Sequence, residues 1–84
     1  MFTVYILRSI KIGRYYIGHS ADAVGRLVAH NAGKVRSTKA YRPWEIIHRE
    51  DYAAKEEAYR REREIKSYKS GMAFQKLIKK SEGC

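Results

Sequence analysis

The segment Arg14–His30, RYYIGHSADAVGRLVAH, gathers side chains that could carry out chemistry into one short stretch. It contains phenol, imidazole and guanidinium groups, which can transfer protons and hold anions. Tyrosines are also ordinary core residues, and basic side chains are ordinary surface residues. Whether these groups form a site depends on the strands and the helix that position them.

Two strands separated by a turn are predicted at Phe2–Leu7 and Tyr15–Gly18, because both segments are rich in β-branched and aromatic residues. If the hairpin folds symmetrically between residues 10 and 11, Tyr5 lies opposite Tyr16. The two phenols would then stand side by side on one face of the sheet. Aromatic cross-strand pairs also stabilise sheets without any catalytic role, and that is the simpler interpretation of the pair alone.

A helix is predicted after the second strand, capped by Ser20 or Asp22 and ended by Gly33. Arg26 and His30 are four residues apart on one flank of this helix, so they are neighbours that could line a cleft beside the hairpin. A solvated arginine and a solvated histidine are the simpler alternative. The predicted stripe of the helix consists of Val24, Leu27, Val28 and Asn31.

The rest of the chain predicts a basic loop, a third strand and two further helices. The loop between residues 33 and 43 has no hydrophobic period and carries Lys34, Arg36, Lys39 and Arg42. The strand is predicted at Trp44–Glu50, and the helices at Tyr52–Ser70 and Met72–Lys80. The order β-β-α-β-α-α predicts a single α/β domain over residues 1–84, with a small three-stranded, mostly antiparallel sheet flanked by helices.

Arg61 and Glu62 interrupt the apolar face of the long helix. Charged groups beside a buried face need partners, which could be ions of opposite charge on the sheet. The carboxylate could instead hold a hard cation such as Mg²⁺, which prefers oxygen ligands. Periodicity does not choose between the two residues or between these roles.

Composition restricts the possible partners and compartments. The chain has 84 residues, 18 Lys and Arg against 9 Asp and Glu, and a net charge of +9, which favours a polyanionic partner such as nucleic acid. It has no apolar run long enough to span a membrane, and its N-terminal segment does not resemble a signal peptide. One cysteine, Cys84, excludes a disulfide framework and fits a reducing, cytoplasmic compartment.

Four segments in this order and spacing, VYIL, YYIG, GRLVAH and EREIK, resemble the GIY-YIG nuclease superfamily. The similarity is strongest to small standalone members, which resemble the nuclease domain of the bacterial excision-repair endonuclease. It covers about residues 2–70. Val4 departs from the glycine after which the first motif is named.

The resemblance implies roles for individual residues. Tyr5 and Tyr16 match the tyrosines of the two motifs, which implies that they position and deprotonate a water, with nearby cations lowering the pKa of one phenol. Which tyrosine is the base stays open. Glu62 matches the metal-binding glutamate, so the resemblance favours it over Arg61 and implies Mg²⁺ or Mn²⁺ as cofactor.

Three further residues match positions around the phosphate. Arg26 matches an arginine that stabilises phosphoryl charge, His30 matches a histidine or tyrosine position, and His19 matches a polar position near the scissile phosphate. We therefore expect a metal-dependent DNA endonuclease or nickase. Its sequence specificity should be weak, because DNA contacts must come from Lys34, Arg36, Lys39, Arg42 and the basic helices. The alternatives are a catalytically quiet nucleic-acid-binding module and a nuclease subunit that needs a protein partner.

Overall fold

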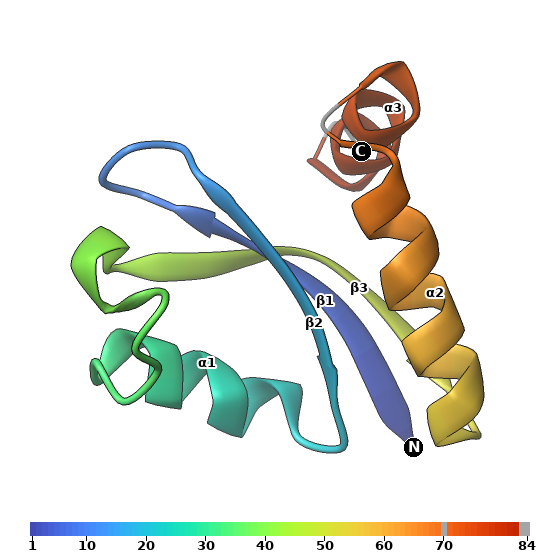
Figure 1. The fold of residues 1–84 in the computed structure, drawn as a ribbon, viewed down its shortest axis with the longest axis horizontal. Helices are drawn as coiled ribbons and strands as arrows, with labels where there is room; N and C mark the ends of the chain where they lie inside the picture. Colours follow the sequence, from blue (N-terminus) through green and yellow to red (C-terminus); the bar gives the residue numbers. More distant parts are fainter. Residues whose placement is uncertain (70, 83–84) are drawn as a thin grey trace.

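The computed structural model describes residues 1–69 and 71–82, so Ser70 and Cys84 lie outside the described residues. Its elements follow the predicted order β-β-α-β-α-α, with one short 3-10 turn added before the third strand (Figure 1). They are β1 (Phe2–Ser9), β2 (Tyr15–Ser20), α1 (Ala23–Asn31), η1 (Lys39–Tyr41), β3 (Trp44–Tyr52), α2 (Lys55–Ser67) and α3 (Met72–Glu82).

The three strands form one sheet in the order β2-β1-β3, and both pairings are antiparallel. The sheet is therefore antiparallel throughout rather than mostly so. The central strand β1 is buried along most of its length, as its nearly continuous apolar sequence requires. Helix α1 covers one face of the sheet, whereas α2 and α3 cover the other (Figure 1).

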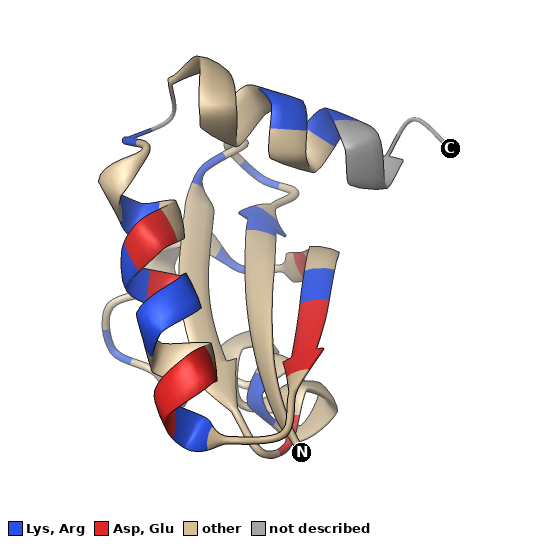
Figure 2. Cartoon of the chain, turned by 90° about the vertical axis from the view of Figure 1, so that its right-hand side faces the viewer, with Lys and Arg blue, Asp and Glu red and all other residues tan. Residues whose placement is uncertain are grey.

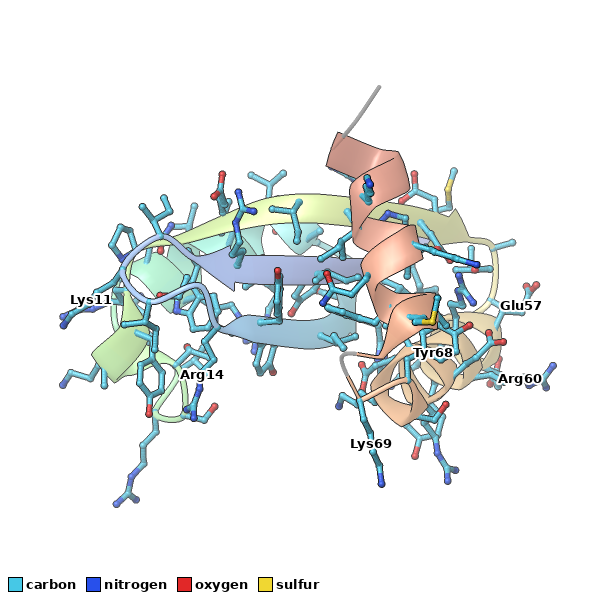
Figure 3. The ribbon with its side chains drawn as sticks, turned by 90° about the horizontal axis from the view of Figure 1, so that it is seen from above. Lys11, Arg14, Glu57, Arg60, Tyr68 and Lys69 are labelled. Carbon is cyan, nitrogen blue, oxygen red and sulfur yellow. The ribbon has the colours of Figure 1, made fainter. Side chains whose placement is uncertain are left out.

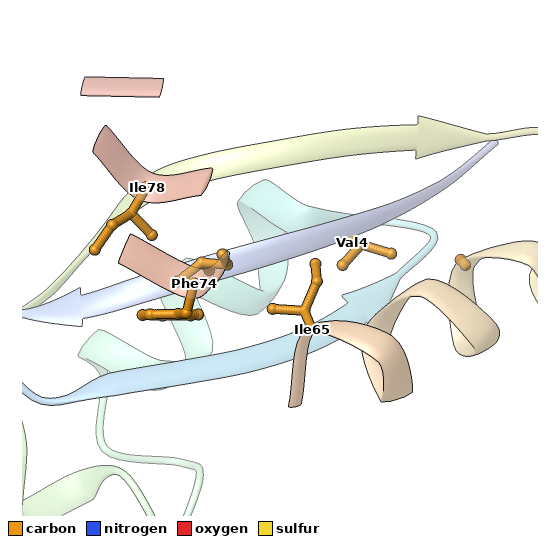
Figure 4. Close-up of a cluster of buried hydrophobic side chains, with 6 residues drawn as sticks. Val4, Ile65, Phe74 and Ile78 are labelled. Atoms are coloured by element: carbon orange, nitrogen blue, oxygen red, sulfur yellow. The ribbon is translucent and has the colours of Figure 1, made fainter. Parts of the chain in front are cut away.

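Each face of the sheet has its own hydrophobic core. Val4 and Ile6 of β1 point to the face covered by α2 and α3, where Ile65, Phe74 and Ile78 pack on them (Figure 4). Tyr5 and Leu7 alternate to the other face, where they pack with Ala23 and Trp44. The predicted tyrosine pair therefore belongs to the α1 face.

The register of the hairpin differs from the symmetric prediction by two residues. Tyr5 pairs with Gly18, and Tyr16 pairs with Leu7. The loop is centred one residue further along the chain because Gly13 adopts a positive φ of 73° and its amide donates to the Ser9 carbonyl at 2.8 Å. Since a shift of two residues preserves the face of each side chain, both tyrosines remain on one face, as diagonal rather than direct neighbours.

The predicted stripe of α1 is right for Leu27, which packs on the core, and for Asn31, whose side chain accepts from the Trp44 amide at 2.6 Å. It is wrong for Val24 and Val28, which are 59% and 63% exposed. Ala23 and His30 are buried instead. The His30 imidazole can take a buried position because Thr38 supplies a hydrogen-bond partner for it, which a hydropathy pattern does not reveal.

Helix α2 is shorter than predicted, and helix α3 is longer than predicted. Asp22 is the N-cap of α1, accepting from the Gly25 amide at 3.0 Å, and Gly25 leaves room for that carboxylate. Helix α2 starts at Lys55 rather than Tyr52, because β3 continues to Tyr52. Among the described residues, none of the helices is long and apolar enough to cross a membrane.

Candidate active site

The two motif tyrosines, Tyr5 of β1 and Tyr16 of the edge strand β2, lie next to each other. Their ring centroids are 6.5 Å apart with planes 25° from parallel. A Cβ atom on Gly18 would lie 2.9 Å from the Tyr5 hydroxyl and 3.1 Å from Tyr16 Cε1. Gly18 is therefore the residue that lets both phenol rings pass close to the backbone of this strand.

His30 of α1 packs against this tyrosine pair. It is 0% exposed, and its ring centroid lies 4.7 Å from that of Tyr16 and 6.4 Å from that of Tyr5. Its Nδ1 atom is 2.8 Å from the Thr38 hydroxyl. Within the described part of the chain, His30 Nε2 is the buried side-chain atom with no hydrogen-bond partner. Burial lowers the pKa of His30, with a further contribution from Arg26, so the imidazole is neutral at physiological pH.

Arg26 is exposed, and its charge acts on both buried rings. Burial raises the pKa of the Tyr5 phenol, although a hydrogen bond from the Arg26 guanidinium opposes this. Arg26 thus acts on Tyr5 in the expected direction, but burial has the larger effect, and the expectation that cations lower the pKa of one of the two tyrosines stays a prediction. The free energy needed to desolvate a phenolate in this position is larger than the stabilisation that one partly solvated guanidinium provides.

Glu62 approaches the same edge of the sheet from α2. It is 8% exposed, and its carboxylate accepts from Lys66 Nζ at 2.7 Å and contacts His19 Nδ1 at 2.6 Å. Burial acts to raise the pKa of Glu62, but the hydrogen bonds from Lys66 and His19 outweigh it and hold the pKa below its usual value. The negative charge of Glu62 makes a small contribution to the raised pKa of the Tyr5 phenol.

The structure places the side chains of Arg61 and Glu62 in different environments. The Arg61 guanidinium donates to Glu50 of β3, with Nε 2.8 Å from Oε1, and therefore forms an ion pair on the sheet. Glu62 points instead to β2 and the site. Neighbouring residues on a helix differ by about 100° in direction, which is enough to send the two side chains to different strands.

His19 joins this group from the opposite face of β2 to Tyr16. Its ring contacts Glu62 through Nδ1 and meets the Tyr59 ring edge-on, with centroids 5.9 Å apart. The site thus surrounds the edge strand, with the tyrosines and His30 on one side and His19 and Glu62 on the other. We call these residues, with Arg26, the edge cluster: Tyr5, Tyr16, His19, Arg26, His30 and Glu62.

The predicted DNA-contacting residues of the loop are exposed. Arg42 is partly held by the loop itself, because its Nε donates to the Lys39 carbonyl at 3.0 Å. The loop reaches the edge cluster through Thr38, whose hydroxyl contacts His30.

Helix α2 carries both basic and acidic side chains, which alternate along it (Figure 2). Arg60 and Glu57 of this helix point away from the sheet (Figure 3).

The donor set around Glu62 is compatible with a hard cation. Over residues 1–69 and 71–82, His, Cys, Asp and Glu side chains form no group of three or more that could enclose a metal ion. This excludes a closed zinc centre built from described residues. Mg²⁺ and Mn²⁺ can be held by one carboxylate together with water and phosphate oxygens, and Glu62 offers a single deprotonated carboxylate of this kind.

Two residues of this region were not predicted from the sequence, Thr38 and Lys66. Lys66 lies four residues after Glu62, so the spacing of an ordinary helical ion pair could have indicated it. Thr38 lies in a loop without periodicity, and no sequence signal places its hydroxyl on His30.

Comparisons of the sequence with known proteins identify relatives of this chain. The sequence model of the GIY-YIG catalytic domain matches residues 1–75. A UPF0213 protein of Staphylococcus epidermidis is 42% identical over 66 residues, covering 77% of this chain and 79% of the relative. UPF0213 proteins of Staphylococcus haemolyticus and Staphylococcus aureus are each 39% identical with the same coverage. The comparison with solved structures finds no match.

Proposed function

The chain belongs to the GIY-YIG family, and on that premise we propose that it is a metal-dependent endonuclease or nickase that hydrolyses phosphodiester bonds in DNA. The observation that carries the proposal is the edge cluster. It combines two phenols, a buried neutral imidazole and an exposed guanidinium with a deprotonated carboxylate on the other side of the edge strand. Phosphodiester hydrolysis needs a cation site, charge stabilisation and a proton acceptor at one place.

Glu62 is the residue that would hold the cation. Its partner Lys66 has a side chain that is 53% exposed, so this ammonium can leave the carboxylate without losing a buried environment. His19 keeps the other oxygen oriented at 2.6 Å. When bound, Mg²⁺ would polarise the phosphate and stabilise charge on the leaving oxygen.

Arg26 and His19 would bind the phosphate. Arg26 is permanently charged and presents a planar fork that fits phosphate oxygens, and its exposed position leaves it accessible to a strand of DNA. His19 contacts Glu62 through Nδ1, and in its imidazolium form it would also donate from Nε2 to an oxygen of the same phosphate. Arg26, and His19 in that form, would stabilise the charge that develops as water attacks.

Proton transfer begins at the tyrosines. In hydrolysis the water oxygen forms a bond to phosphorus, the bond from phosphorus to the leaving oxygen breaks, and a water proton moves to a base. Because the pKa of Tyr5 is raised, Tyr5 is protonated in the free protein and serves first as a hydrogen-bond donor. Tyr16 lies closer to His30, whose Nε2 can accept the phenol proton as the phenol takes one from water.

Recognition of DNA would be electrostatic. Lys34, Arg36 and Lys39 are exposed beside the segment that reaches His30 and supply contacts to the phosphate backbone, which carry no sequence information. We therefore propose weak sequence specificity. A protein partner that supplies substrate recognition, and a catalytically quiet DNA-binding module, are the competing functions.

The test is a supercoiled-plasmid nicking assay on the purified chain, with Mg²⁺, with Mn²⁺ and with a chelator. We expect open-circular product with either metal and none with the chelator. Binding of plasmid without any nicking in either metal would favour the quiet module. Nicking that persists in chelator would contradict the proposed role of Glu62.

A further inference from the structure

We propose that Thr38 is a positioning residue that fixes the tautomer of His30, with the proton on Nδ1 and a free lone pair on the buried Nε2 atom. This inference rests on the proposed function, because the lone pair would be the proton acceptor of that reaction. The assignment itself concerns the resting protein and can be tested without any activity.

The first step of the argument is the hydrogen-bond inventory of Thr38. Its hydroxyl oxygen lies 2.8 Å from His30 Nδ1 and 3.3 Å from the Val35 carbonyl. A carbonyl oxygen can only accept, and a hydroxyl has one proton to donate. When that proton goes to Val35, the remaining contact is satisfied only if His30 Nδ1 is the donor.

The second step concerns how firmly Thr38 is held. It is 2% exposed, and its carbonyl accepts from the Trp44 indole Nε1 at 3.0 Å. Thr38 also ends a turn, since its amide donates to the Val35 carbonyl at 3.2 Å. These contacts fix the position of the Thr38 hydroxyl. The hydroxyl can therefore determine the orientation of the His30 imidazole.

The third step concerns the far side of the ring. A neutral imidazole has one protonated nitrogen, so a proton on Nδ1 leaves Nε2 as an acceptor. Nε2 is buried with no partner among the described residues, and the charged and titratable groups facing the ring are Tyr5, Tyr16 and Arg26. Arg26 and the burial of the ring favour the neutral form. A neutral imidazole that packs against two phenol rings and keeps one nitrogen as an acceptor has the form that proton removal from a phenol requires.

The tautomer is measured by long-range ¹H–¹⁵N correlation of ¹⁵N-histidine-labelled protein, with the His30 signals assigned from a His30→Gln variant. We expect a pyrrole-type shift for Nδ1 and a pyridine-type shift for Nε2. In Thr38→Val, which keeps the shape and removes the hydroxyl, we expect the two shifts to move toward each other as both tautomers become populated. Thr38→Ser should restore the wild-type pattern, and Ser37→Ala should leave it unchanged.

The same variants are then assayed for single-turnover nicking, normalised to the folded fraction from thermal melting. We expect Thr38→Val to lower the rate about 10- to 100-fold, the scale seen when the hydrogen-bond partner that orients a functional imidazole is removed. Thr38→Ser should recover most of the rate.

A pyrrole-type shift for Nε2 in the wild-type protein would overturn the tautomer assignment. An unchanged pattern in Thr38→Val would overturn the claim that Thr38 fixes the tautomer. A changed pattern with wild-type nicking in Thr38→Val would overturn the positioning role and leave the nuclease proposal intact. If wild-type protein does not nick but shows the expected shifts, the nuclease proposal fails while the tautomer assignment stands.

Discussion

Arg61 and Glu62 are neighbours in α2, yet they enter two charge clusters that are built differently. Arg61 belongs to the Glu50 cluster, in which the Glu50 carboxylate accepts from His48, Tyr52 and two nitrogens of Arg61 at 2.6 to 3.1 Å. Among the described residues, Glu62 has two hydrogen-bond partners, His19 and Lys66. A carboxylate has about four accepting positions, so Glu50 is saturated and Glu62 is not.

This difference separates a structural ion pair from a site. The saturated environment holds the pKa of Glu50 down at about 2, because the hydrogen bonds from Arg61, Tyr52 and His48 outweigh burial. Glu62 keeps its charge with fewer partners, and one of them is half exposed. A carboxylate that is charged but incompletely coordinated can bind a further cation, whereas a saturated one can only stabilise the fold.

The strongest test of this comparison is Glu62→Gln, which keeps the shape and removes the charge. We expect metal-dependent nicking to fall by roughly 10³-fold or more, because the residue that holds the cation is lost. Folding and DNA binding should stay near wild type, as measured by thermal melting and by a filter-binding titration. Glu57→Gln, an exposed carboxylate on the same helix, is the matched control (Figure 3). Full activity of Glu62→Gln would place any ion elsewhere, and loss of folding would make Glu62 a structural residue like Glu50.

The second test removes the phenol hydroxyls from the edge cluster. If one tyrosine transfers the proton, Phe at that position should slow single-turnover nicking by ~10²–10⁴-fold, the usual scale for a positioned acid or base. Thermal stability should change little, because the ring remains. Tyr15→Phe is the control, since Tyr15 lies on the other face of β2 and packs on Phe74 with centroids 5.0 Å apart. Wild-type rates in Tyr5→Phe, Tyr16→Phe and the double variant would make the pair a packing feature.

The third test addresses the Glu50 cluster and should affect stability rather than catalysis. At pH 7 we expect Glu50→Gln to unfold more easily by about 2 kcal/mol, because the buried part of the Arg61 charge loses its partner. The pKa of Glu50 is about 2 in the folded protein against an ordinary 4.5, so its contribution is present above pH 4.5 and is lost as pH falls toward 2. Urea titrations between pH 2 and 7 should therefore show a flatter pH dependence in the variant. Unchanged stability with lost nicking would reverse the roles assigned to the two clusters.

The smallest effect is expected from exposed charges that belong to neither cluster. Replacing Lys34, Arg36 and Lys39 by Ala should weaken DNA binding and reduce the slope of log affinity against log salt by about 0.9 for each lost phosphate contact. The nicking rate at saturating DNA should remain near wild type. Affinities measured from low to moderate salt provide the slope, and an unchanged slope would move the DNA-binding surface away from this loop.

The fold could be predicted almost completely from the sequence, because its strands are short, strongly β-forming and separated by clear turn and helix signals. The register of the hairpin could not, since it depends on the left-handed conformation of Gly13, and a symmetric turn is equally consistent with the pattern. The buried side of α1 is only partly predictable, because His30 is buried through its contact with Thr38, and hydropathy assigns a histidine to the surface.

The site was predicted less completely than the fold. The residues alone left Arg61 and Glu62 equivalent, and the resemblance favoured Glu62, which the structure places beside His19 rather than in the Glu50 cluster. The raised pKa of Tyr5 was not predictable, because it depends on how far burial outweighs one arginine. The catalytic roles of Tyr5, Tyr16 and Glu62 stay predictions until the variants are measured.

Trp44 gives this molecule an optical signal at an informative place. It is the only tryptophan in the chain, it is 3% exposed, and its indole donates to the Thr38 carbonyl in the loop that carries Lys34, Arg36 and Lys39. Indole emission responds to the loss of a hydrogen bond and to entry of water. Light emitted by one buried ring therefore reports whether the loop is seated on α1, so binding of a polyanion to the loop can be followed in unlabelled protein, in real time and before any bond is cut.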